Sequence, residues 1–217
     1  MERIGYKVNS LNAGKIETLT FGKKTFDSAI RKQAVENPVW VHSLGITGDE
    51  QAYKDHGGTE KALCQYPYEY YDYWKDLLGH MNQQSLFGEN LSTIGLTEKN
   101  THIGDVFSLG EARLQVTEPR QPCYKLAAKY GIPDLVMRMQ DSGYTGFMFR
   151  VLEEGWVSRD DELILLERDK KRISIAQVNQ VKWNKKATAE EIDTILSVES
   201  LSKTLRETLI KRKKADN

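Results

Sequence analysis

One of the two cysteines of the chain, Cys123, lies in a segment rich in proline and basic residues, EPRQPCYKLAAKYG. A thiol acts as a nucleophile or a metal ligand in its thiolate form, and nearby positive charge lowers its pKa. Arg120 and Lys125 supply such charge within three residues of the thiol. Pro119 and Pro122 stiffen the segment and keep it out of a helix and out of a central strand. These features predict a reactive or metal-binding thiol about as well as a small buried core residue, because free cysteines are often buried.

A second candidate segment, GDEQAYKDHGGTEKAL, contains His56, which is followed by two glycines and then by Lys61. Glycine adopts positive φ and lets the backbone approach a ligand closely. The imidazole and the ammonium are therefore candidates for lining a binding pocket. The alternative is a surface turn with a solvated histidine, and a single HGG is a weak signal for a site.

The segment LFGENLSTIGL contains a tight turn in which Glu89 and Asn90 follow a glycine. Each of these two side chains could hydrogen-bond a polar heterocycle, and each could equally hold the loop together. The other cysteine, Cys64, lies in the apolar, strand-like stretch ALCQY. That setting favours a core position for Cys64.

Three further cations stand in or beside predicted strands. Arg31 and Lys32 are adjacent in SAIRKQAV, and Arg150 interrupts the apolar stretch FMFRVLEEG. A charged residue in such a strand is rarely fully buried without a partner. Arg150 is therefore predicted to face a polar pocket, an acidic neighbour or solvent, and the alternation of side chains along a strand favours solvent.

Short strands separated by turns are predicted over the first 167 residues. β-Branched and aromatic residues are enriched in RIGYKVNSL, PVWVHSL, ARLQVTE, TGFMFRVLEEG and ELILLER, with Gly, Asn and Asp between them. One helix is expected to begin at Pro67 and to end at Gly79, and a second helical zone covers KLAAKYG and IPDLVMRMQ. Many strands without βαβ alternation predict a mainly β fold with flanking helices (α+β), in which the strands form a closed or nearly closed barrel.

The pattern changes to helical after residue 167. Ser174 is predicted to cap IAQVNQVKW, and Thr188 begins a capping box, TAEE. The last stretch carries leucines at helical spacing, at Leu201, Leu205 and Leu209. We therefore expect two domains, residues 1–167 and residues 168–217, of which the second is a small three-helix bundle. A unit of that size is near the lower limit for folding alone, so we expect it to pack on the first.

The overall composition excludes several classes of protein. The chain has 217 residues, two cysteines and four histidines without zinc-ligand spacing, which argues against a disulfide framework and a structural zinc site. No apolar run approaches the roughly 20 residues of a membrane helix, and MERIGYKVNSLN lacks the layout of a signal peptide. We therefore expect a cytoplasmic protein without membrane contact. Residues 168–217 carry 13 Lys and Arg against 7 Asp and Glu. No nucleic-acid-binding motif accompanies this basic tail, so we do not expect nucleic acid as a partner.

Four motifs occur together and in order: GDEQAYKDHGGTEKAL, LFGENLSTIGL, HIGDVFSLGEARLQVTEPRQPCYKL and YTGFMFRVLEEGWV. In this combination the chain resembles the MOSC family, named after the C-terminal domain of molybdenum cofactor sulfurases. It resembles most closely the bacterial stand-alone branch implicated in resistance to 6-hydroxylaminopurine. The resemblance covers essentially the whole chain, since that branch carries a small three-helix domain after the MOSC domain. It implies a MOSC-type β-barrel, in agreement with the strand-rich pattern.

The resemblance also implies roles for individual residues. Cys123 matches the cysteine of the PRxPC motif, the family's proposed sulfur carrier or molybdenum ligand. The basic residues thought to hold the phosphate and the pterin of the molybdenum cofactor (molybdopterin) map onto Arg120, Arg31, Lys32, Lys61 and Arg150. His56 and Asn90 are implied to line the pocket. Glu89 is expected to be structural, because a carboxylate repels a phosphate.

Two functions are compatible with these roles. In the first, the protein is an oxidoreductase in which Cys123 binds molybdenum and a small N-hydroxylated compound, such as 6-hydroxylaminopurine, is reduced to an amine. No stretch looks like a flavin, haem or iron–sulfur site, so the electron donor is expected to be a separate flavoprotein or iron–sulfur protein. In the second, Cys123 carries a persulfide, or the pocket carries the cofactor, without substrate turnover. Turnover by cofactor-loaded protein with an artificial donor distinguishes the two.

Overall fold

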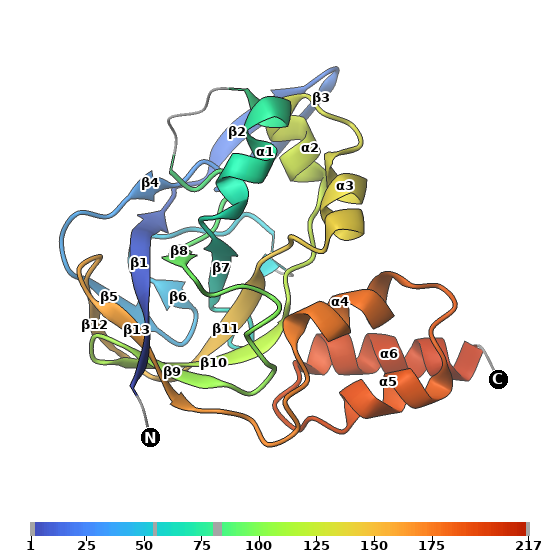
Figure 1. Ribbon diagram of the computed structural model, residues 1–217. Coiled ribbons are helices and arrows are strands. Elements are labelled where there is room, and N and C mark those ends of the chain that lie inside the picture. The colour runs from blue at the N-terminus through green and yellow to red at the C-terminus, as the bar shows by residue number, and fades with distance from the viewer. Residues whose placement is uncertain (1–2, 54–55, 80–83, 216–217) are drawn as a thin grey trace.

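The computed structural model describes residues 3–53, 56–79 and 84–215. Seven strands form a closed barrel (Figure 1). Around the barrel they follow the order β13 (Glu162–Glu167), β9 (Val106–Leu109), β10 (Ala112–Pro119), β11 (Phe147–Glu153), β7 (Leu63–Pro67), β8 (Leu91–Ile94) and β1 (Ile4–Ala13). β1 pairs in turn with β13, which closes the barrel. Neighbouring strands are antiparallel except for β7 and β8, which are parallel.

Aromatic side chains fill the interior of the barrel. Phe107, Phe147 and Phe149 are fully buried. The ring centroid of Phe149 lies 5.9 Å from that of Phe107 and 5.5 Å from that of Phe147, in edge-to-face contact. Phe147 and Phe149 share one face of β11 because side chains alternate along a strand. Burying each such side chain stabilises the fold by about 1.5–3 kcal/mol.

Smaller strands extend the barrel. β4 (Gln33–Ala34) pairs with the end of β1. A separate three-stranded sheet consists of β5 (Val39–His42), β6 (Gly45–Ile46) and β12 (Gly155–Val157). A projecting hairpin consists of β2 (Glu17–Phe21) and β3 (Lys24–Ser28).

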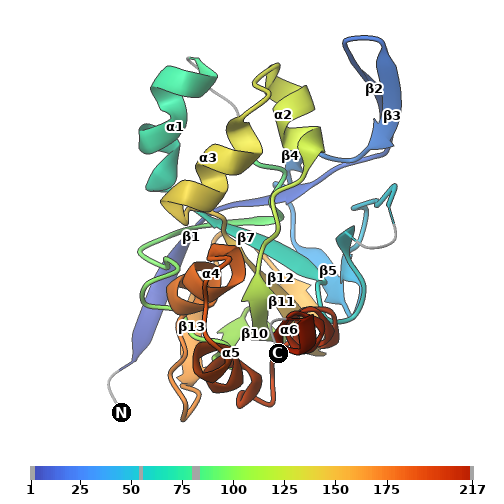
Figure 2. The ribbon, with the colours of Figure 1, turned by 90° about the vertical axis from the view of Figure 1, so that its right-hand side faces the viewer.

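Three helices lie at the end of the barrel nearest this hairpin (Figures 1 and 2). They are α1 (Tyr70–Leu78), α2 (Tyr124–Tyr130) and α3 (Leu135–Ser142). Tyr66, Trp74 and Phe87 belong to a hydrophobic cluster that packs beneath them. The rings of Tyr66 and Phe87 stack at 4.2 Å, and the Trp74 indole donates to the Tyr66 hydroxyl over 2.7 Å. This cluster fixes the helices on the barrel.

The three C-terminal helices pack together against the barrel near β10 (Figure 1). They are α4 (Ile175–Trp183), α5 (Ala189–Leu196) and α6 (Lys203–Ala215). Capping boxes begin α4 at Ser174 and α5 at Thr188. Val178, Ile192 and Leu205 belong to the same hydrophobic core as the interior of the barrel. The predicted packing of this segment on the main body is therefore confirmed, while the division into two domains at residue 168 stays a prediction.

The expected α+β class, with a β-barrel and flanking helices, is confirmed. Two predictions about proline are wrong. Pro67 is the last residue of β7, opposite Thr93, and the helix begins three residues later at Tyr70. Pro119 is the last residue of β10, a central strand, where it lies opposite Phe147. A proline is tolerated at these strand ends because the ladder needs no further N–H there.

The helices of the described residues are all too short or too polar to cross a membrane.

Candidate functional site

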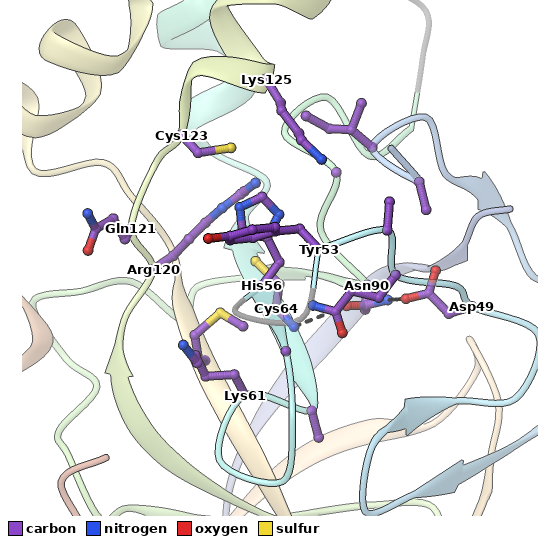
Figure 3. A pocket seen from close by; sticks show the side chains of 18 of the residues that line it. Asp49, Tyr53, His56, Lys61, Cys64, Asn90, Arg120, Gln121, Cys123 and Lys125 are labelled. Carbon is purple, nitrogen blue, oxygen red and sulfur yellow. Dashed lines mark hydrogen bonds between the residues drawn. The ribbon is translucent and has the colours of Figure 1, made fainter. Parts of the chain in front are cut away.

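A cavity of about 770 Å³ lies beside the barrel, between loops that follow β3, β6 and β10 and the C-terminal helices. Segments far apart in the sequence meet in its wall, at residues 28–32, 49–53, 61–64, 118–125 and 204–208. Figure 3 shows Cys123 and Lys125 at one end of the cavity and Lys61 towards the other. The cavity therefore joins the PRQPC segment to the HGG segment.

Cys123 lies between β10 and α2. Its backbone is extended, with φ −122° and ψ 164°, and it immediately precedes the first residue of α2. Only Arg120, Gln121 and Pro122 separate it from the end of β10, so the rigid barrel sets the position of the thiol. The side chain is half-buried and lines the cavity. Of the two interpretations left open by the local sequence, this placement favours a thiol that meets a ligand.

Arg120 lies in the cavity wall beside Cys123 (Figure 3). Its backbone N–H donates to Gly146 over 3.0 Å, and its Nη2 atom donates to the carbonyl oxygen of Phe87. Its Nη1 atom is buried and has no hydrogen-bond partner in the part of the chain that the structure describes. Burial by itself lowers the pKa of Arg120, but the neighbouring acidic groups, Cys64 foremost, raise it above its ordinary value. Arg120 is therefore a permanent cation with one donor group that has no partner among the described residues.

Lys125, the second residue of α2, also lines the cavity. Its side chain is buried, and its ammonium donates to the carbonyl oxygen of Asp27 over 2.7 Å. The same ammonium lies 5.7 Å from the centre of the Phe26 ring. These contacts tie α2 to the β2–β3 hairpin and keep a second positive charge near Cys123.

Asp49 organises a network that the sequence did not reveal. Its carboxylate pairs with the buried ammonium of Lys32, accepts from the backbone N–H of Gly14 over 2.8 Å and accepts from the Asn90 amide over 2.7 Å. Asn90 in turn accepts from the backbone N–H of Cys64 over 3.2 Å. Lys32 and Asn90 both line the cavity, and Asp49 balances the charge of Lys32. Binding of a cofactor by these two residues stays a prediction.

His56 and Lys61 also line the cavity. The imidazole of His56 packs edge-on against Tyr53, with ring centroids 5.1 Å apart. The ammonium of Lys61 lies 3.7 Å from the carboxylate of Glu118, which is buried at the end of β10. The HGG segment therefore contributes both predicted side chains to the same cavity as Cys123.

Arg31 and Arg150 do not line this cavity. Arg31 is exposed and lies 3.7 Å from Glu17. Arg150 pairs with Glu60 at 3.1 Å and donates to the carbonyl oxygen of Ser200 over 3.0 Å. Arg150 thus has the acidic neighbour that was one of its three predicted environments. Binding of a cofactor by these two arginines stays a prediction.

Cys64 and Glu89 occupy structural positions. Cys64 is buried in β7, although its residue borders the cavity, and burial raises the pKa of its thiol. Glu89 is fully buried, accepts from the backbone N–H of Phe87 over 3.0 Å and accepts from the Tyr71 hydroxyl. Its carboxylate holds the Gly88 turn together, as the sequence analysis expected.

Four cavity residues come from the C-terminal helices and were missed by sequence reasoning. They are Lys182, Thr204, Leu205 and Thr208. No local signal distinguishes them from the solvated or core positions of an ordinary helix, because their place in the cavity wall arises only when the bundle packs on the barrel.

Comparisons with known proteins agree with this architecture. A family model described as "MOSC domain" matches residues 52–164. The Bacillus subtilis protein YflK is 44% identical over 214 residues, which are 98% of this chain and 97% of that protein. A protein named "Reductase" from Gibberella moniliformis is 36% identical over 179 residues, which are 79% of this chain and 31% of that protein.

A solved structure extends the likeness to three dimensions. The crystal structure of YiiM from Geobacillus stearothermophilus superposes with a TM-score of 0.82 at 36% identity, and the superposition covers 96% of this chain and 99% of that chain. The family match includes the loops that carry His56, Asn90 and Cys123. The chain belongs to the MOSC domain family.

Proposed function

We propose that this protein binds the molybdenum cofactor and reduces N-hydroxylated compounds, such as 6-hydroxylaminopurine, to amines. The observation that carries this proposal is the placement of the Cys123 thiol beside Arg120, whose buried Nη1 atom has no partner among the described residues. Membership of the MOSC family supports the cofactor, and the name of the Gibberella relative supports a reductase.

The residues present fit such a cofactor. A phosphate needs cations with available N–H groups, and the Nη1 group of Arg120 is one. Across the described residues, no group of three or more His, Cys, Asp and Glu side chains could hold a metal ion. Cys123 therefore offers molybdenum a single soft thiolate, which suits a metal that arrives with sulfur ligands of its own. The cavity of about 770 Å³ lies within the usual range for small-ligand sites.

The reaction is a two-electron reduction. The N–O bond of the hydroxylamine breaks, two electrons and two protons are taken up, and an amine and water form. When bound, the cofactor supplies the redox chemistry, and the chain supplies binding and orientation. In this proposal Arg120 binds the anionic part of the cofactor, Cys123 fixes its metal, and a separate flavoprotein or iron–sulfur protein delivers the electrons.

The first experiment measures molybdenum and pterin in protein purified from a host that makes the cofactor. We expect both in the wild type and loss of molybdenum in Cys123→Ala. Cys64→Ala is the matched control, because Cys64 is the buried thiol of β7, and it should retain both. Absence of pterin from the wild type would contradict the proposal, and the thiol of Cys123 would then be tested for a persulfide by mass spectrometry.

The second experiment measures turnover. Cofactor-loaded protein is given a reduced viologen as electron donor and 6-hydroxylaminopurine as substrate, and the amine is quantified. Amine formation supports the reductase. A cofactor-loaded protein that forms no amine would contradict the reductase and favour the carrier alternative.

A further inference from the structure

The three C-terminal helices contribute one wall of the cavity. α4 supplies Lys182, and α6 supplies Thr204, Leu205 and Thr208. Leu205 is buried in the shared core, whereas the two threonines are exposed. This wall therefore contains one cation, two hydroxyl-bearing residues and one buried leucine.

The start of α6 is fixed to the barrel by polar contacts. The Ser202 hydroxyl donates to Glu118 over 2.7 Å, and the Ser202 N–H donates to the carbonyl oxygen of Thr117 over 3.2 Å. The N–H of Lys203 donates to Glu60 over 2.9 Å. Since Thr204 and Leu205 follow directly, the wall is held in place without any ligand.

Lys182 brings a second lysine to the end of the cavity that holds Lys61. Glu118 lies between Lys61, at 3.7 Å, and the Ser202 hydroxyl, at 2.7 Å, so both of its oxygens are engaged. The ammonium of Lys182 lies 4.8 Å from the centre of the Trp183 ring. Among the described residues, no carboxylate oxygen lies within 4.0 Å of the Lys182 ammonium, the limit for an ion pair. Among the described residues, Lys182 thus interacts with a carboxylate, Glu118, whose two oxygens already contact Lys61 and Ser202.

The opposite end of the cavity already has its own cations. Arg120 and Lys125 lie beside Cys123, and Figure 3 shows Lys61 away from them. A cofactor bound through Arg120 leaves the charge of Lys182 unused. A half-buried lysine that faces a ligand cavity is well suited to bind a phosphate as a point charge.

We propose that Lys182, together with the Thr204 hydroxyl, forms a substrate subsite that binds a phosphate, so that the preferred substrates are N-hydroxylated nucleotides rather than free bases. This inference rests on the proposed function. Its subsite is assigned to the substrate and not to the phosphate of the cofactor, because Lys182 interacts electrostatically with Glu118 and Lys61. Figure 3 shows Lys61 away from Arg120 and Cys123.

Calorimetry tests the subsite without turnover. Adenosine 5′-monophosphate and adenosine are titrated into wild type, Lys182→Met, Lys182→Arg and Lys211→Met, an exposed lysine on α6 as control. We expect the wild type and the control to prefer the monophosphate by about tenfold or more, the Met variant to lose that preference, and the Arg variant to keep part of it. No preference in the wild type, or equal weakening of both ligands by Lys182→Met, would overturn the proposal.

The pH dependence of monophosphate affinity tests whether Lys182 is the residue that binds the phosphate. Burial lowers the pKa of Lys182 to about 8, Glu118 on β10 opposes that shift, and Lys61 adds to it. The ammonium is charged below this pKa, so monophosphate affinity should fall as the pH rises through about 8. Lys182→Arg should retain its affinity at higher pH, since arginine stays protonated. A wild-type profile that is flat from pH 7 to about 9, across the titration of a lysine with this pKa, would contradict the assignment.

The pterin content distinguishes the two sources of phosphate. Lys182→Met should carry as much pterin and molybdenum as the wild type. Loss of pterin, with the preference for the monophosphate retained, would assign Lys182 to the cofactor and overturn the proposal. Because the calorimetry needs no reduction step, its result stands even if no reductase activity is found.

Discussion

The two cysteines border one cavity but lie in different kinds of backbone. Cys64 is in β7, paired with strands on both sides, and its side chain is buried among barrel residues. Cys123 follows a three-residue loop and precedes α2, and its side chain is half-buried. Burial raises the pKa of Cys64 and so disfavours its thiolate. Both thiols border the cavity, so what distinguishes them is the backbone that carries them. A paired strand buries the thiol of Cys64, whereas a loop before a helix leaves the thiol of Cys123 accessible to a ligand.

The largest expected effect is on activity. Cys123→Ala should lower kcat/KM for 6-hydroxylaminopurine by more than about 100-fold, because loss of a metal ligand should exceed the effect of losing an outer-shell partner. Cys64→Ala should lower it by less than about threefold, since it removes one buried atom from a strand. Both values are measured with reduced viologen as donor. Equal losses of kcat/KM in the two variants would contradict the assignment of Cys123, rather than Cys64, as the metal ligand.

Chemical modification should separate the thiols by a smaller factor. Iodoacetamide should alkylate Cys123 at least about tenfold faster than Cys64, because a buried thiol with a raised pKa reacts through local opening. Peptide mass spectrometry at timed intervals gives both rates from a single sample. Cys64 modified as fast as Cys123 would show that its thiol is open to the cavity.

The smallest expected effect is on stability. Cys64→Ser should lower the free energy of unfolding by about 1–3 kcal/mol, because it buries a hydroxyl in place of a thiol. Cys123→Ser should change it by less than about 0.5 kcal/mol. Urea unfolding followed by circular dichroism measures both. A larger loss for Cys123→Ser would assign Cys123 to the core.

Local interactions were predicted correctly from the sequence. Ser174 and Thr188 begin helices through capping boxes that close within three residues. Arg120 and Cys123 are three residues apart in one loop, so the motif alone places them together. Such features involve residues only a few positions apart, so the local backbone conformation is enough to bring them together.

Long-range pairings were not predicted. Asp49 balances Lys32 across 17 residues, and Glu60 pairs with Arg150 across 90 residues. The environments of Pro67 and Pro119 were also misjudged, because strand pairing decides where each strand ends. Each of these depends on which strands become neighbours, and no local pattern specifies that.

The sequence by itself determined the strand-rich class, the capped C-terminal helices and the loop that presents Cys123. Only the tertiary structure decided which cations are available to a ligand. Asp49 pairs with Lys32, the Nη1 atom of Arg120 is left without a partner among the described residues, and Lys182 joins the cavity wall, because closing the barrel and packing the bundle bring charges from distant segments together. Whether a charge is neutralised depends on the charged groups that lie close to it, and the tertiary fold determines which groups those are.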